Sequence, residues 1–338
     1  MISRALHFGM DAVMCGMMNV AQWRLRDQTV TKERLEEYLA ECSTLDRPTY
    51  YATPEEKRSS YPNSYAEEWN RDRNHLSWNS PLAGPWKENQ RAHADLYEIS
   101  GEKRSGAPTV ILLHSLMSAN DFGYRRIAKH FNRKGWNVLF PHFPFHYRRR
   151  LRGRENGSLT ITSDLIRNAE TIRQSVIELR QLMSWIRRRG CHRIALLGTS
   201  YGAWVAALTL SLEKTDFSIL LQPIVDPNYA TFGSPASRVM SVLLKRKGVH
   251  AAHLEQHAHL ISPRYSQVMT PPDRITVIGG RYDRLSPSSH LISLCRAWGG
   301  ARYREVDQGH FGYGAMQCAL AEAEHFLERP SQDVHYQD

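Results

Sequence analysis

From residue 93 onward, short apolar segments alternate with segments of helical periodicity, and this alternation constrains the fold more than any other feature of the sequence. The segments predicted as strands are Ala94–Ile99, Thr109–Leu113, Trp136–Phe140, Arg193–Leu197, Ser218–Leu221, Ile275–Ile278 and Arg302–Val306. Helices are predicted between most of them. Apolar strands separated by helices form mainly parallel sheets that helices cover on both faces. We therefore expect an α/β fold built on a mainly parallel, twisted sheet.

One helix is marked more clearly than the others. Apolar residues recur at helical spacing from Leu165 to Ile186, Thr162 or Ser163 is placed to cap the first turn, and Gly190 ends the pattern. A helix of this length with one apolar face is expected to pack along the sheet.

Residues 1–92 do not follow the alternation, and we expect them to form an N-terminal extension packed on the body. Residues 4–20 are predicted as an amphipathic helix, with a secretion signal or membrane anchor as the alternative. A second helix is predicted over Thr31–Cys42, with its start at Thr31. The segment 50–86 is predicted to be irregular, but its many aromatic residues indicate that it is packed rather than disordered.

The main domain is expected over residues 93–330. Within it, residues 223–272 break the alternation with a helical pattern. An insertion at this point follows the end of a strand, so it would overhang the sheet edge like a lid.

The sequence Gly198-Thr199-Ser200-Tyr201-Gly202 lies directly after a predicted buried strand and directly before an Ala-rich helix. In this context a G-x-S-x-G turn projects its serine from the sheet, and the glycines permit a turn in which larger side chains would clash. Ser200 is therefore predicted to be a nucleophile. The alternative is an ordinary glycine-rich turn.

A serine nucleophile needs an imidazole to take its proton, and that imidazole needs an acceptor to orient it. His310 lies in a loop just after the last predicted strand, and Asp283 follows the strand before it. The order Ser200, Asp283, His310 is the order expected for a triad built on this kind of sheet. Asp226, which follows another strand, is the alternative to Asp283.

The oxyanion that forms during acyl transfer needs two backbone N–H donors. The amide of Tyr201, the residue after the nucleophile, is one expected donor. The other is expected in the turn after Thr109–Leu113, where Leu116 is preferred and Ser115 or Met117 are alternatives.

Together these residues resemble the α/β-hydrolase superfamily over about residues 93–328, with the departure that His114-Ser115 stands where many members have His-Gly. Three short motifs are similar to a poorly characterised bacterial branch related to the eukaryotic α/β-hydrolase-domain proteins of the type numbered eighteen. These motifs are Trp78-Asn79-Ser80-Pro81, Pro144-Phe145-His146-Tyr147-Arg148-Arg149 and Ser163-Asp164-Leu165-Ile166-Arg167. The branch implies no particular substrate.

The predicted function is that of a serine hydrolase, without a cofactor, that cleaves a carboxylic ester or lipid ester through an acyl-enzyme on Ser200. Thioester hydrolysis, amide cleavage and acyl transfer use the same residues. A catalytically silent scaffold that binds a lipid or protein partner is a further alternative. A dinucleotide-binding oxidoreductase is disfavoured because no G-x-G-x-x-G follows a predicted strand.

The formal net charge of +10 favours anionic partners, but no nucleic-acid-binding motif accompanies it. The basic run around His146, Arg148 and Arg149 follows a strand end, where ligands bind in such sheets. An acidic group on the substrate, or a lipid phosphate, is therefore one hypothesis for this run, and a solvated loop is the other. The pair His253 and His257 lacks the H-E-x-x-H spacing, so no metal site is expected.

Five scattered cysteines without a C-x-x-C pair favour a reducing compartment, and a cytoplasmic location is expected. No apolar run reaches the length of a membrane span, although peripheral contact with a membrane is left open.

Overall fold

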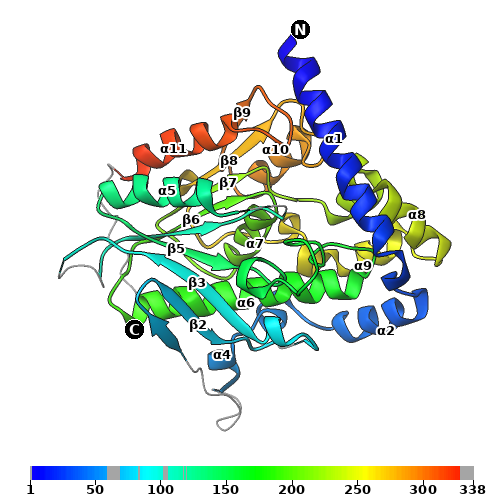
Figure 1. Cartoon of the computed structure of the whole chain (residues 1–338), viewed down its shortest axis with the longest axis horizontal. Coiled ribbons are helices and arrows are strands. Elements are labelled where there is room, and N and C mark those ends of the chain that lie inside the picture. The colour runs from blue at the N-terminus through cyan, green and yellow to red at the C-terminus, as the bar shows by residue number, and fades with distance from the viewer. Residues whose placement is uncertain are drawn as a thin grey trace.

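The computed structural model describes residues 2–58, 69–82, 84–101, 106–116, 118 and 120–327. Its centre is a nine-stranded sheet in the order β1-β2-β3-β5-β4-β6-β7-β8-β9 (Figure 1). The strands are β1 Asn70–Asp72, β2 His75–Asn79, β3 Arg91–Tyr97, β4 Thr109–Leu113, β5 Asn137–His142, β6 Ile194–Thr199, β7 Phe217–Leu221, β8 Ile275–Gly280 and β9 Arg302–Val306. From β5 to β9 all neighbours are parallel, and β1, β2 and β3 join in antiparallel pairing.

All seven predicted strands are present, and the mainly parallel sheet is confirmed. The prediction that residues 50–86 are irregular is wrong for β1 and β2. In β2, Trp78 pairs with Ala92 of β3 and is fully buried, although its neighbours include His75 and Asn79. These short, polar strands carry no periodic apolar signal, because their partners rather than their own sequence determine their burial.

Helices cover the sheet on both faces, as predicted (Figure 1). Their bounds are α1 Ile2–Arg24, α2 Lys32–Cys42, α3 Arg47–Tyr50, α4 Pro54–Arg58, α5 Phe122–Arg133, α6 Leu165–Arg188, α7 Tyr201–Thr209, α8 Arg238–Arg246, α9 Ala251–Ile261, α10 Ser288–Ala297 and α11 Gly314–Leu327. On one face, α5 and α11 bury Phe131 and Phe326; on the other, α6, α7 and α10 bury Leu182, Val205 and Leu291. Each such side chain contributes about 1.5–3 kcal/mol relative to an exposed one. This core holds the strand ends in place.

The helix starts follow local capping. Thr31 accepts a hydrogen bond from the amide of Arg34 and begins α2, as predicted. In α6 the cap is Asp164 rather than Thr162 or Ser163, because its carboxylate accepts from the amide of Arg167 at 3.1 Å. A carboxylate at this position also interacts favourably with the positive end of the helix dipole.

The N-terminal segments lie against the rest of the molecule. Helix α1 contacts α8 and the short helix Pro235–Ser237, and α2 contacts α6 and α9 (Figure 1). Between β7 and β8 the chain forms α8 and α9, so the helical pattern predicted for residues 223–272 is present. These helices from distant parts of the sequence meet beyond the carboxyl end of the sheet.

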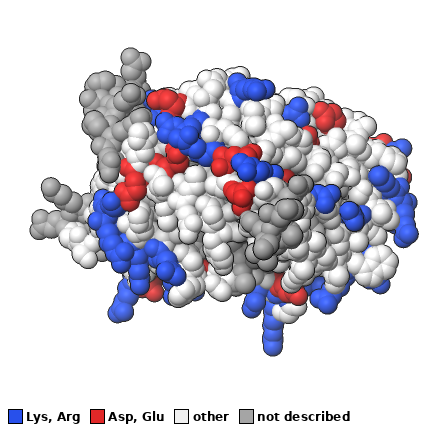
Figure 2. All heavy atoms as spheres, turned by 90° about the horizontal axis from the view of Figure 1, so that it is seen from above, with Lys and Arg blue, Asp and Glu red and all other residues white. Residues whose placement is uncertain are grey.

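Charges of both signs lie on the face of the molecule that is seen from above in Figure 2. On the face that Figure 2 shows, Asp and Glu side chains lie among the Lys and Arg side chains. The positive net charge is therefore not gathered into one basic cleft on that face.

Candidate active site

Ser200 lies in the turn between β6 and α7, in a conformation that non-glycine residues rarely adopt, with φ 51° and ψ −110°. The two flanking glycines make this turn possible. A Cβ atom on Gly198 would lie 2.7 Å from the carbonyl oxygen of Gly202, and one on Gly202 would overlap the carbonyl of Leu113 in the adjacent strand. The G-x-S-x-G sequence thus packs the turn tightly against β4 and holds the serine above the sheet end.

His310 lies in the loop after β9, and its Nε2 is 2.9 Å from Oγ of Ser200. The imidazole is almost fully buried, with 5% of its side chain exposed. This distance is within hydrogen-bond range, so the ring can take the serine proton without a movement of the backbone.

Asp283 lies beyond β8, and its Oδ2 is 2.8 Å from Nδ1 of His310. Its Oδ1 accepts hydrogen bonds from the amides of Leu285 and Ser286, each at 2.8 Å. Because a carboxylate accepts, Nδ1 of His310 is the donor in this pair, which leaves Nε2 free to accept from Ser200. The structure thus brings Ser200, His310 and Asp283 together in the order that the sequence predicts.

The surroundings of His310 affect its pKa in opposing ways. Burial lowers the pKa, because it disfavours the charged imidazolium. The charge of Asp283, its hydrogen bond and the charge of Asp11 outweigh burial, so that the pKa of His310 is raised above its ordinary value. A base with a raised pKa holds an abstracted proton more firmly.

Asp226, the alternative acid, is engaged elsewhere. Its Oδ1 accepts from the amide of Tyr229 at 2.9 Å, and its Oδ2 is 3.1 Å from the guanidinium of Arg264. It therefore stabilises a turn at the surface, and Asp283 is the carboxylate that the structure places on His310.

Gln222, at the end of β7, is a site residue that the sequence analysis missed. Its Nε2 donates to Oδ2 of Asp283 at 2.7 Å and to the carbonyl of Gly309 at 2.8 Å. It therefore connects the acid to the loop that carries His310. The only sequence signal is its position directly after a buried strand, where side chains reach the same edge as Ser200.

Asp11 of α1 is a second residue that the sequence analysis missed. Its carboxylate accepts from the backbone amide of His310 at 2.9 Å and from that of Phe311 at 3.2 Å. Asp11 is 4% exposed, and burial raises its pKa while the two amide hydrogen bonds oppose that rise. A carboxylate from the N-terminal helix thus fixes the backbone of the histidine loop.

The predicted oxyanion donors border the same site. Tyr201 is the first residue of α7, where backbone amides have no partner within the helix. Leu116, in the turn after β4, also lines the cavity, and its carbonyl is 2.8 Å from Nε2 of the buried His146. Ser115 also borders the cavity, whereas Met117 lies outside the described residues.

A cavity of about 490 Å³ opens beside Ser200 and His310. Its described lining includes no Lys, Arg, Asp or Glu. The wall is largely apolar and comes from α1, α2, α6, α7 and the segment between β7 and β8; its members include Met14, Met18, Leu35, Leu39, Ile161, Leu165, Ile172, Trp204, Ile224, Met240, Leu254 and Ile261. Such a cavity suits an apolar ligand next to one small polar centre.

The basic run does not reach this cavity. Arg149 is fully buried, and its guanidinium contacts both carboxylate oxygens of Glu178 on α6, at 2.6 and 2.9 Å. Burial lowers the pKa of His146 to about 4, so its neutral ring offers no positive charge to an anion. Arg148 is exposed. The geometry therefore does not support the hypothesis that these three residues contact an acidic group of the substrate. The sequence suggested it because nothing near Arg149 in the sequence reveals that Glu178 pairs with it.

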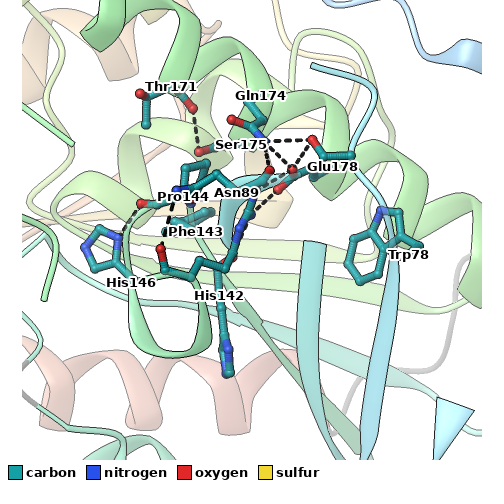
Figure 3. Close-up of polar contacts among 12 residues, drawn as sticks. Trp78, Asn89, His142, Phe143, Pro144, His146, Thr171, Gln174, Ser175 and Glu178 are labelled. Carbon is teal, nitrogen blue, oxygen red and sulfur yellow. Dashed lines mark hydrogen bonds and ion pairs between the residues drawn. The ribbon is translucent and has the colours of Figure 1, made fainter. Parts of the chain in front are cut away.

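The short motifs that begin at Trp78 and Pro144 both contribute residues to the buried polar cluster around Glu178 (Figure 3). Glu178 also accepts from the hydroxyl of Ser80 at 2.6 Å and from the amide of Gln174 at 2.9 Å. Arg149 donates further to the carbonyls of Asn89 and His142, both at 3.0 Å. Residues of both motifs thus contact Glu178, and these contacts connect the end of β2 and the loop after β5 to α6.

His253 and His257 on α9 lie in different surroundings. Burial lowers the pKa of His257 to about 4, and its ring packs against the edges of Tyr38 and Tyr50. His253 contacts the backbone of His250 instead. Among the residues that the structure describes, no group of three or more His, Cys, Asp or Glu side chains could hold a metal ion.

Comparison with known proteins adds to this geometry. No protein-family model matches the chain. Two uncharacterised proteins of Mycobacterium tuberculosis are 25% identical to it over 203 residues, which are 57% of this chain and 46% of theirs. The chain therefore spans about half the length of the curated relatives it matches.

Among solved structures, the acetyl xylan esterase of Paenibacillus sp. R4 is similar over 90% of this chain and 98% of its own, with a TM-score of 0.57 and 13% identity. The chain has the α/β-hydrolase fold. The esterase Est2 of Thermogutta terrifontis covers 73% of this chain and 92% of its own at 18% identity and a TM-score of 0.49. At 13% identity the likeness to the Paenibacillus esterase establishes the fold alone, and the chemistry has to be argued from the site. The narrower bacterial branch stays a prediction.

Proposed function

We propose that this α/β-hydrolase-fold protein is a serine hydrolase that cleaves carboxylic esters with an apolar acyl or alcohol group. The observation that carries the proposal is the continuous chain of contacts from Ser200 Oγ to His310 Nε2 at 2.9 Å and from His310 Nδ1 to Asp283 Oδ2 at 2.8 Å, at the wall of an apolar cavity. A serine, a buried histidine and a buried aspartate in this arrangement form an activated nucleophile.

In the first half of the reaction, Oγ of Ser200 forms a bond to the ester carbonyl carbon while Nε2 of His310 takes the hydroxyl proton. The tetrahedral intermediate collapses, the ester C–O bond breaks, and His310 returns the proton to the leaving alcohol. Water then attacks the acyl-enzyme by the same route and releases the acid and Ser200. Asp283 stabilises the imidazolium that forms in each half.

The amides of Tyr201 and Leu116 are proposed as the oxyanion donors. Both residues line the same cavity as Ser200, which supports this assignment. His146, which contacts the carbonyl of Leu116, is proposed to hold this turn rather than to bind substrate. Loss of one oxyanion donor typically costs about 10²–10³ in rate.

The cavity favours an apolar substrate over an anionic one, because its described lining carries no cationic Lys or Arg side chain. The Paenibacillus relative is named for ester cleavage, which is the same class of bond. Thioester cleavage and acyl transfer to another acceptor use the same residues, and a panel of esters and thioesters separates thioester cleavage from ester cleavage.

The test is labelling with a fluorophosphonate probe, combined with a panel of esters and thioesters of short, medium and long acyl chains. The wild type should be labelled and should turn over apolar esters. Ser200→Ala should lose labelling and at least about 10⁴-fold in kcat, since the nucleophile is removed. Ser43→Ala, at an exposed serine, is the matched control. Absence of labelling in the wild type would favour a silent scaffold.

A further inference from the structure

Helix α1 separates the cavity from the surface, and its two sides differ. On the inner side, Met14, Met18 and Gln22 line the cavity, and Asp11 contacts the histidine loop. Asn19 fixes the helix by accepting from the amide of Val239 at 2.8 Å and donating to the carbonyl of Pro235 at 2.9 Å. The helix is thus seated on the body by defined polar contacts.

The outer side of α1 is apolar and exposed. Its large side chains and their exposed fractions are Met10 38%, Val13 64%, Met17 54%, Val20 54% and Trp23 49%. Between Met10 and Trp23 the sole charged residue is Asp11, which is buried. A solvent-facing helix normally carries charged residues on its outer face, so a row of large apolar side chains there indicates an interaction surface.

The neighbouring helix α8 supplies positive charge. Arg238, Lys245 and Arg246 are exposed on it, together with Val242, which is 48% exposed. The helix contains no Asp or Glu. The exposed positions of α1 from Met10 onward and those of α8 therefore combine apolar and basic side chains without a carboxylate.

We propose that α1 and α8 form a docking surface for a lipid surface that carries anionic headgroups, with the apolar side chains of α1 among the acyl chains and the basic side chains of α8 at the headgroups. An amphipathic helix with apolar and basic residues binds a membrane in this way, lying in its plane. None of the described helices combines the length and the apolar character that a membrane span needs. We call the exposed residues Met10, Val13, Met17, Val20, Trp23, Arg238, Val242, Lys245 and Arg246 the docking face.

The docking face lies next to the entrance of the cavity. Met10 belongs to both, since it lines the cavity and is partly exposed. Tyr313 also lines the cavity, and 88% of it is exposed. A lipid surface in contact with α1 would therefore meet the entrance to the apolar cavity, which gives a lipid ester a short route to Ser200. The route rests on the proposed function, whereas the docking itself does not.

The experiment measures co-sedimentation of the full chain with vesicles of phosphatidylcholine alone and of phosphatidylcholine mixed with phosphatidylglycerol. The wild type should bind the mixed vesicles, and added salt should weaken the binding. The double variant Val13→Glu/Met17→Glu should bind at least about tenfold more weakly, because carboxylates replace apolar groups at the interface. Lys245→Ala/Arg246→Ala should lose roughly fivefold per residue on mixed vesicles.

The controls separate docking from misfolding and from the chemistry. Phe122→Glu replaces an exposed aromatic residue on α5, outside the docking face, and should bind as the wild type does. Hydrolysis of a short soluble ester by Val13→Glu/Met17→Glu should be unchanged, because neither residue lines the cavity. Failure of the proposed function would abolish turnover in the wild type but leave vesicle binding intact.

Three results would overturn the docking proposal. The first is a wild type that does not sediment with mixed vesicles. The second is equal weakening by Phe122→Glu and by Val13→Glu/Met17→Glu. The third, in analytical ultracentrifugation, is a wild-type dimer that Val13→Glu/Met17→Glu converts to monomers while vesicle binding is unchanged; the docking face would then bind a second copy of the chain.

Discussion

Two buried polar clusters in this protein have similar parts but different surroundings. The first joins Ser200, His310 and Asp283 at the carboxyl end of the sheet, and the second joins Arg149 and Glu178 beside α6 (Figure 3). Each contains a buried carboxylate with several hydrogen-bond donors around it. If buried charge alone identified functional sites, the two clusters would be equally good candidates.

The difference lies in what each cluster leaves available. The Arg149 cluster lies inside the fold: its ion pair is bidentate, and the carbonyls of His142 and Asn89 accept from the two terminal guanidinium nitrogens. The Ser200 cluster ends at a hydroxyl that borders a cavity, on a residue held in a rarely adopted backbone conformation. A network that is enclosed in the core stabilises the fold, whereas a network that ends at a cavity can act on a ligand.

Of the variants that test this difference between the two clusters, Asp283→Asn is expected to have the largest effect, and the effect is on kcat. The carboxamide can no longer stabilise the imidazolium of His310 and favours the wrong tautomer, so kcat should fall by about 10³–10⁴. Asp283 raises the pKa of His310, so its loss lowers that pKa. His310 acts as a base when neutral, so the acidic limb of the pH profile of residual activity should move to lower pH.

The measurement is steady-state kinetics on a soluble ester from acid to neutral pH. Asp226→Asn is the matched control, because Asp226 contacts Tyr229 and Arg264 rather than His310. Equal losses in the two variants would show that Asp283 has no special role.

Unlike Asp283→Asn, Glu178→Ala should strongly lower the free energy of unfolding and have little effect on turnover. It leaves the guanidinium of Arg149 buried without its counterion, and removal of one partner of a buried pair typically costs about 3–5 kcal/mol of unfolding free energy. Denaturant unfolding checks this value. The exposed pair of Glu305 with Arg281 offers a control, and Glu305→Ala should cost less than about 1 kcal/mol.

Turnover per folded molecule in Glu178→Ala should stay near that of the wild type. A selective loss of kcat at full folding would contradict the view that the Arg149 cluster is structural.

Asp11→Asn should give the smallest of these effects. The amide oxygen of the new side chain can still accept a hydrogen bond, but the charge that helps to raise the pKa of His310 is gone. We expect a loss of roughly tenfold in kcat, equivalent to one weakened charged hydrogen bond. The acidic limb of the pH profile should again move to lower pH.

Asn19→Ala separates this role from the seating of α1. This substitution removes the two hydrogen bonds of the Asn19 side chain, with the carbonyl of Pro235 and the amide of Val239, and leaves Asp11 unchanged. If Asn19→Ala moved the pH profile as far as Asp11→Asn does, Asp11 would act only by holding the helix.

Much of the fold could be predicted from the sequence, because its signals are local. The strands from β4 to β8 are largely apolar runs bounded by turns, and the turn around Ser200 carries its glycines in sequence. The three residues that meet at the site each follow a strand end, and parallel strands present those ends at one edge. Sequence order was therefore enough to suggest their proximity.

The remainder depends on contacts between distant segments. Arg149 belongs to a basic run that suggests an exposed loop, and only its pairing with Glu178 on α6 explains its burial. Asp11 interrupts the apolar sequence of α1, and no neighbour in the sequence explains a carboxylate there. Its carboxylate accepts a hydrogen bond from the amide of His310, which only the folded chain brings close. Such residues satisfy the backbone or charge of another segment, and nothing in their own neighbourhood of the sequence identifies the partner.

The hydrogen bond between Asp11 and the amide of His310 spans 299 positions of the chain. During synthesis, α1 leaves the ribosome long before the loop that it supports has been made. The contact that fixes the backbone of His310 therefore cannot form until the chain has been made through residue 310 and α1 has met the histidine loop. The same dependence means that a tag or deletion at the N-terminus that displaces α1 would affect the histidine loop directly.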